Sequence, residues 1–125
     1  MADTFSVIHG FRTLICDADG PVIRDERSAT DVMGDAFGRR AEVVVVPVQR
    51  LTDDFFVLRT RVAGEIAQKF TNYRLLLVVV GDIAGHLAAS APLRDFVRET
   101  NQGDHLWFLE DLGAVTERLA VRRAA

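Results

Sequence analysis

Runs of apolar residues divide the chain into strand-forming segments. Two short runs, 5–9 and 12–17, are separated by Gly10, and so short a link predicts an antiparallel hairpin. Three later runs are almost wholly apolar, which is typical of strands that are buried on both faces. These later runs span 43–48, 75–80 and 105–109.

Helices are predicted between the strands that follow the hairpin and after the last strand, because apolar residues recur there every three or four positions. Each of these segments starts at a residue whose side chain can cap a helix. The predicted helices run from Ser28 to Gly38, from Thr52 to about Thr71, from Ser90 to Gly103, and onward from Asp111.

The order of these segments defines the fold class. Strands separated by helices form parallel pairs with right-handed crossovers, so only the first strand is expected to be antiparallel. We predict a single α/β domain over residues 1–125, with its core at about 5–122. It contains a mixed, mostly parallel sheet of about five strands, with an antiparallel N-terminal hairpin and about four helices.

Composition narrows the function classes. An apolar fraction of 49 % in 125 residues is enough for a core without disulfides or metal. The single cysteine, Cys16, suits a reducing compartment, and the longest apolar run is too short to span a membrane, so a cytoplasmic protein is expected. The net charge of −3 provides no basic surface for nucleic acid. The three histidines lack metal-ligand spacing, so neither a metal nor a cofactor is predicted.

The segment TLICDADGPVIRD, residues 13–25, resembles the first motif of the haloacid dehalogenase superfamily, in which two aspartates serve a magnesium ion and a phosphoryl group. Asp17 and Asp19 would be those aspartates. That superfamily also uses a later acidic pair, and the second acid after Asp82 is missing here. Aspartate and glycine also form turns, aspartate by bonding nearby amides and glycine by tolerating a positive φ. We therefore interpret residues 17–20 as a turn and do not expect a phosphatase.

Four stretches carry a resemblance to a known family. VVVPVQRL, FFVLRTRVAGEIAQKFTNYRL, VVGDI and LRDFVRETNQG are similar to the bacterial domain-of-unknown-function family numbered 4180, over roughly residues 12 to 120. The order of elements, with RLLLVVVGD and LWFLEDLGAVTERL, also resembles the STAS domain of anti-sigma-factor antagonists. This second resemblance implies a STAS-like sheet, the binding of partner proteins and small ligands, and in some members a switch by phosphorylation at a helix start.

A ligand site is expected at the carboxyl ends of the parallel strands, where open α/β sheets bind ligands. The candidate ligand-binding residues are Gln49, Arg50, Arg59, Asp82 and His86. A helix that begins at Thr52 would point Arg59 at the sheet among apolar neighbours, where an unpaired charge is too costly to persist. The side chain would either extend past the helix start to water or pair with an acid. The predicted acid is Asp82, with Glu110 and Asp111 as alternatives. A small anionic ligand would suit such a site.

The outer face of the helix predicted over 52–71 is the candidate interface. Its residues are Arg61, Gly64, Glu65 and Gln68. Glycine at an exposed helical position costs about 1 kcal/mol relative to alanine, and a partner that approaches closely would explain it. Thr60 falls where the STAS resemblance places the phosphorylated residue, although the Asp-Ser pattern of that family is replaced here by Arg59 and Thr60.

Two functions are consistent with this pattern. The first is a non-catalytic regulatory or protein-interaction module, whose partner is another protein or a second copy of the chain. The second is a small-molecule-binding protein or small enzyme with a pocket at the carboxyl ends of the parallel strands. Neither nucleic acid nor a membrane is an expected partner.

Overall fold

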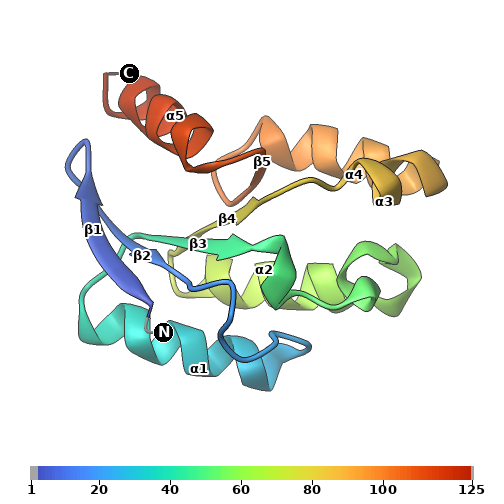
Figure 1. Cartoon of the computed structure of the whole chain (residues 1–125), viewed down its shortest axis with the longest axis horizontal. Helices are drawn as coiled ribbons and strands as arrows, with labels where there is room; N and C mark the ends of the chain where they lie inside the picture. The colour runs from blue at the N-terminus through green and yellow to red at the C-terminus, as the bar shows by residue number, and fades with distance from the viewer. Residues whose placement is uncertain (1–2, 125) are drawn as a thin grey trace.

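A five-stranded mixed sheet forms the centre of the computed structural model, which describes residues 3–124. The strand order is β1-β2-β3-β4-β5, with β1 and β2 antiparallel and the remaining pairs parallel (Figure 1). The strands are β1 Thr4–Ile8, β2 Phe11–Ile15, β3 Val43–Pro47, β4 Leu76–Val80 and β5 Leu106–Leu109. The predicted N-terminal hairpin and parallel sheet are therefore confirmed.

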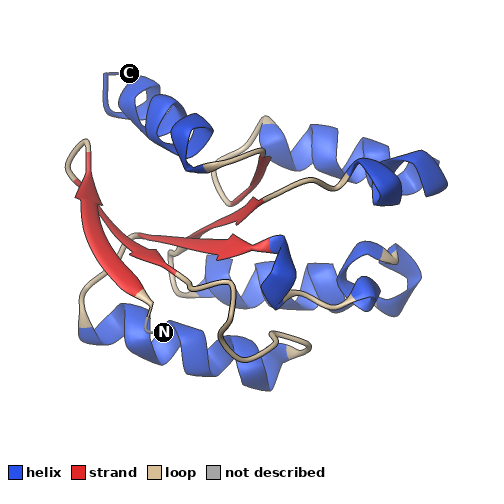
Figure 2. Cartoon of the chain, viewed as in Figure 1, coloured by secondary structure: helices blue, strands red, loops and turns tan. Residues whose placement is uncertain are grey.

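Helices lie on both sides of the sheet, whose strands Figure 2 shows in red between blue helices. The helices are α1 Glu26–Gly38, α2 Val62–Asn72, α3 Ala84–Ala89, α4 Ala91–Asn101 and α5 Leu112–Ala124. Side chains of α1, α2 and α4 share one apolar core with the sheet, whereas α5 closes a smaller core on the opposite face. Consecutive right-handed crossovers along a sheet of this order place their helices on the same face, and α5, which follows the last strand, is free to cover the other.

The alternation of side chains along β3 explains why both faces need cover. Val44 and Val46 belong to the larger core, while Val43 and Val45 belong to the core beneath α5. All four are almost completely buried. On the α5 side the guanidinium of Arg118 lies 4.1 Å from the centre of the Trp107 ring, so part of this core is closed by a cation–π contact.

The single helix predicted from Thr52 to Thr71 is wrong. Two short 3₁₀ turns, Asp53–Phe56 and Leu58–Thr60, precede α2, and Arg61 between them and α2 has a left-handed backbone with φ 66°. The first turn places Phe55 and Phe56 in the core, where both are buried although they lie outside α2. Thr52 does not cap a helix, and its buried hydroxyl has no hydrogen-bond partner among the described residues.

Arg59 does not face the sheet, because the break at Arg61 changes the phase of the segment before it. Its side chain is exposed, and within the described part of the chain it forms no ion pair with Asp82, Glu110 or Asp111. The predicted buried pair is therefore wrong.

Apart from Thr52, the helix caps lie at or near the predicted residues. Ser90 and Asp111 cap α4 and α5 as predicted: Leu93 N donates to Ser90 Oγ at 3.2 Å, and Ala114 N donates to Asp111 Oδ1 at 2.9 Å. The cap of α1 is Asp25 rather than Ser28, which sits at the third helical position and completes a capping box.

Candidate functional site

Arg50 ties the loop after β2 to the sheet. It lies in a 3₁₀ turn, Val48–Arg50, directly after β3, and only 3 % of the residue is exposed. Its Nε donates to the carbonyl of Pro21 at 2.5 Å, and its Nη1 donates to the carbonyl of Asp17 at 2.9 Å and to Asp3 Oδ1 at 3.3 Å. The guanidinium proposed from the sequence as a ligand-binding group is thus occupied by the chain itself.

The Asp17–Gly20 segment is the turn that the guanidinium holds. Asp17 Oδ1 accepts a hydrogen bond from Asp19 N at 2.8 Å, and Gly20 N donates to the carbonyl of Asp17 at 3.2 Å. Gly20 is not among the residues with positive φ; a β-carbon there would overlap the Arg50 guanidinium. The turn is confirmed, but its glycine makes room for a side chain and does not adopt a left-handed backbone.

The short helix α3, which the sequence analysis did not predict, separates Asp82 from His86. Asp82, Ala84 and Leu87 line a hollow on one side of α3, and Gly85 and His86 line a hollow on the other. Residues one turn apart share a helix face, whereas neighbours such as Ala84 and Gly85 point apart, so the two predicted ligand residues cannot meet at one site.

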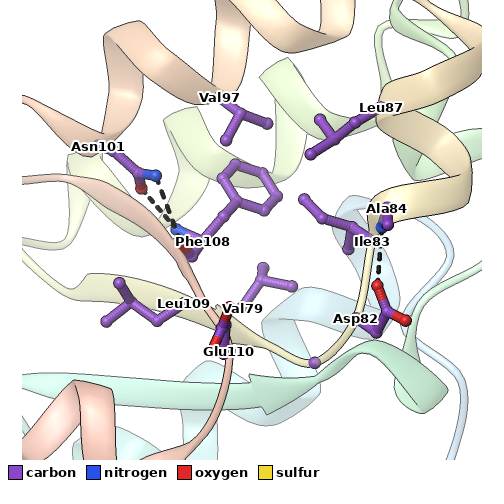
Figure 3. A pocket seen from close by; sticks show the side chains of 11 residues that line it. Val79, Asp82, Ile83, Ala84, Leu87, Val97, Asn101, Phe108, Leu109 and Glu110 are labelled. Carbon is purple, nitrogen blue, oxygen red and sulfur yellow. Dashed lines mark hydrogen bonds between the residues drawn. The ribbon is translucent and has the colours of Figure 1, made fainter.

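The first hollow, called here the acidic pocket, has a volume of about 580 Å³. It lies at the carboxyl ends of β4 and β5, between these strands, α3 and α4 (Figure 3). Its lining residues are Val79, Gly81, Asp82, Ile83, Ala84, Leu87, Val97, Asn101, Phe108, Leu109 and Glu110. Two carboxylates and no cationic side chain line it, which gives it a negative character.

The second hollow, called here the Arg59–His86 cleft, has a volume of about 450 Å³. The His86 ring stacks on the Phe56 ring, with 4.1 Å between the ring centres and 12° between the planes. Arg59 and Ser90 also line this cleft. The structure therefore brings together Arg59 and His86 from the predicted ligand set, but leaves Asp82 and Arg50 elsewhere. Gln49 is exposed and lines neither hollow.

The four residues predicted as an interface share a third hollow, called here the α2 groove. It has a volume of about 590 Å³ and is lined by Glu26, Leu58, Arg61, Gly64, Glu65, Gln68, Lys69, Asn72 and Phe96. Gly64 has no atom within 4 Å of the place its β-carbon would take, so the backbone of α2 is open to an approaching chain at this point. Glu26 from α1 and Phe96 from α4 form the sides of the groove, which the sequence analysis did not foresee.

Thr60 supports the start of α2. Its hydroxyl lies 2.7 Å from each of the carbonyl oxygens of Asp54 and Val57, and it accepts a hydrogen bond from Val62 N at 3.3 Å. The predicted phosphorylation position is thus a structural residue at the amino end of α2.

Cys16 and Arg118 have shifted pKa values and lie outside these hollows. Burial raises the pKa of the Cys16 thiol to about 12, and the nearby carboxylate of Asp3 adds to the effect. Burial against Trp107 lowers the pKa of Arg118. In the described residues 3–124, no cluster of three or more histidine, cysteine, aspartate or glutamate side chains could hold a metal ion.

The sequence profile of the family described as "Domain of unknown function (DUF4180)" matches residues 8–119. The chain belongs to the DUF4180 family. No curated protein and no solved structure matches this DUF4180 chain. None of the helices in its described part is long and apolar enough to cross a membrane. The family resemblance inferred from the sequence is confirmed, and it covers the acidic pocket, the Arg59–His86 cleft and the α2 groove.

Glu110 and Phe96 are among the site residues that were not predicted from the sequence. Glu110 was considered only as a partner for Arg59, although it follows the last apolar run just as Asp82 follows the run before it. Residues that directly follow neighbouring parallel strands meet at one edge of the sheet, so this signal was present. Phe96 packs against the larger core and also reaches the α2 groove.

Proposed function

We propose that this DUF4180 domain is a non-catalytic regulatory module that docks with another protein chain through the α2 groove. The observation that carries the proposal is Gly64, which lies open in the first turn of α2, in a groove that Arg61, Glu65 and Gln68 also line. A glycine here weakens an exposed helix by about 1 kcal/mol relative to alanine, and no atom of the described chain requires it. Close approach of the backbone of a second chain would explain why position 64 is glycine.

The proposed occupant is α2 of a second copy. The groove carries both signs of charge, with Arg61 and Lys69 against Glu26 and Glu65. A twofold interface brings a surface against itself, so a surface of mixed charge can complement itself, whereas a surface of one sign would repel its copy. Gly64 allows the two helices to approach closely at their crossing.

The STAS resemblance adds finer features to the proposal. They are a STAS-like fold, a bacterial cytoplasmic setting and control by phosphorylation of Thr60. A phosphate on that hydroxyl would break its contacts with the carbonyls of Asp54 and Val57 and would place negative charge beside Arg61, at the edge of the groove.

The test compares Gly64→Arg with Gly34→Arg by sedimentation velocity over a range of protein concentrations. Gly34 is a matched control because it is also an exposed helical glycine, in α1, with no atom within 4 Å of its β-carbon position. We expect the wild type and Gly34→Arg to dimerise alike and Gly64→Arg to weaken dimerisation about tenfold or more. A wild type that stays monomeric at about 1 mM, or equal dimerisation of both variants, would overturn the proposed occupant.

A charge exchange identifies the occupant independently. In the proposed dimer Arg61 of one copy faces Glu65 of the other. Arg61→Glu alone and Glu65→Arg alone should each weaken the dimer, and the double variant should recover part of the loss, because it restores opposite charges at each contact. Failure of the double variant to recover would exclude the self-complementary arrangement.

A second candidate function, the binding of a small molecule, is favoured by the acidic pocket at the carboxyl ends of β4 and β5.

A further inference from the structure

We propose that the acidic pocket binds an organic cation, a small molecule with an apolar body and a primary ammonium group. This inference does not depend on the α2 groove, which is lined by a separate set of residues. It also reverses the charge expected from the sequence, which had assigned Asp82 to a site for a small anion.

The floor of the pocket is apolar and already formed. Val79, Phe108 and Val97 lie on it and are 1 %, 6 % and 9 % exposed. Figure 3 shows Phe108, Val97, Ile83 and Leu87 turned toward one another across the hollow. A volume of about 580 Å³ is within the usual range for small-molecule sites, in which an apolar surface supplies affinity and a few polar groups fix orientation.

The polar groups that remain free at the pocket are carboxylates. Asp82 uses Oδ1 to accept a hydrogen bond from Ala84 N at 2.9 Å, which leaves its second oxygen available. Glu110 has neither a hydrogen bond nor an ion pair with any residue in the described range 3–124. Both lie on the side of the hollow away from Val97 (Figure 3).

The third polar side chain at the pocket, Asn101, already forms hydrogen bonds within the protein. The Asn101 amide accepts a hydrogen bond from Phe108 N at 2.7 Å and donates to the Phe108 carbonyl at 3.3 Å, so it is not free to bind a ligand. No lysine, arginine or histidine is among the residues that line the pocket, whereas Arg59 and His86 lie on the far side of α3. A carboxylate ligand would face two like charges and no counter-charge, while an ammonium group would face two charges of the opposite sign.

The test uses three probes of similar size and shape: 2-phenylethylamine, 3-phenylpropanoate and 3-phenylpropanol. Each is titrated into the ¹⁵N-labelled full chain and followed by amide chemical shifts. We expect the amine to bind with a dissociation constant of about 1–10 mM, which is reasonable for a fragment of this size, and to shift the amides of Gly81–Ala84 and Leu109. The carboxylate should bind at least about tenfold more weakly than the amine, and the alcohol should fall between them.

Variants assign the binding to the two acids. Asp82→Asn keeps the oxygen that accepts the Ala84 hydrogen bond, and Glu110→Gln keeps the size of an exposed side chain. The double variant should bind the amine about tenfold more weakly than the wild type and should bind the alcohol with unchanged affinity. Glu117→Gln, which removes one exposed acid on α5, is the matched control and should leave all three probes unchanged.

Three results would overturn the proposal. They are an absence of amine binding at about 20 mM, binding of the carboxylate as tight as that of the amine, and an equal loss of amine and alcohol in the double variant. None of these measurements depends on the oligomeric state, so their failure is distinct from failure of the α2 groove proposal.

Discussion

The guanidinium of Arg50 lies over Gly20, in the space that a β-carbon at position 20 would need. Arg50 donates to the carbonyls of Pro21 and Asp17 on either side of this glycine. The turn after β2 and the turn after β3 therefore pack against each other, because the Arg50 side chain fills the space that Gly20 leaves open.

Gly20→Ala should destabilise the fold, because the new methyl group overlaps a guanidinium that is held by its own hydrogen bonds. Forced overlap in a packed interior costs about 1–3 kcal/mol, and we expect a loss in this range by urea denaturation. Arg50→Met should cost about 3 kcal/mol or more, because it removes three hydrogen bonds and takes away the positive charge that pairs with Asp3. In the Arg50→Met background Gly20→Ala should cost less than about 1 kcal/mol. Additive losses would show that the two residues are not coupled.

Asp17 and Asp19 should not support phosphoryl transfer. Asp17 Oδ1 is occupied by the amide of Asp19, and the Asp17 amide donates to Asp3 Oδ1 at 2.8 Å, so the pair forms a turn tied to the start of the chain. With magnesium and a panel of phosphate esters, we expect no turnover that depends on Asp17. Hydrolysis that is present in the wild type and abolished in Asp17→Asn would contradict this interpretation.

Arg74→Gly should stabilise the protein by about 1 kcal/mol. Arg74 directly follows Tyr73, the C-cap of α2, and has a left-handed backbone with φ 59°. Leu75 N donates to the Phe70 carbonyl at 2.9 Å, which is the hydrogen bond of a helix end that favours glycine at position 74. Arg74→Ala is the control: it removes the same side chain but keeps the β-carbon, and should bring no such gain. The free energy of unfolding of each variant is measured by denaturant titration. Equal changes in Arg74→Gly and Arg74→Ala would mean that loss of the arginine side chain, and not relief of the left-handed backbone, causes the change in stability.

Asp25 should stabilise the fold in a pH-dependent way. Hydrogen bonds from the amide and hydroxyl of Ser28 lower the pKa of the Asp25 carboxyl. A carboxyl whose pKa is lower in the folded state stabilises that state above its unfolded pKa, and this contribution is lost as the pH falls through the folded value. Asp25→Ala should therefore unfold more easily than the wild type at pH 7, and the difference should shrink below about pH 4. A difference that is constant from pH 7 to about pH 3 would exclude the charge as its source.

Cys16 should be inert in the folded protein. Its thiol is buried, and a pKa of about 12 leaves very little thiolate at pH 8. Labelling with iodoacetamide at pH 8 should follow the rate of unfolding and accelerate in denaturant. Rapid labelling of the native chain would place Cys16 at an accessible site instead.

The sequence by itself determined the elements whose signals are local. The hairpin around Gly10, the buried strands and the caps at Ser90 and Asp111 were all predictable, because alternation of apolar residues and capping chemistry act over a few neighbouring residues. Four residues of the α2 groove were predicted from helical spacing. Gly64, Glu65 and Gln68 share a face of α2 because residues three and four apart lie together on a helix, and Arg61, directly before α2, lines the same groove.

Only the tertiary structure decided where the charged residues of the candidate site lie. Arg50 binds Pro21, 29 residues away in the sequence, and no local pattern encodes that contact. The left-handed backbone at Arg61 separates the two short turns from α2, so that Phe55 and Phe56 are buried while Arg59 is exposed. The six-residue helix α3 is too short to give a periodic signal, yet it separates Asp82 from His86. Contacts between distant segments set these positions, because burying large apolar side chains outweighs the weaker preference of any short segment for one regular conformation.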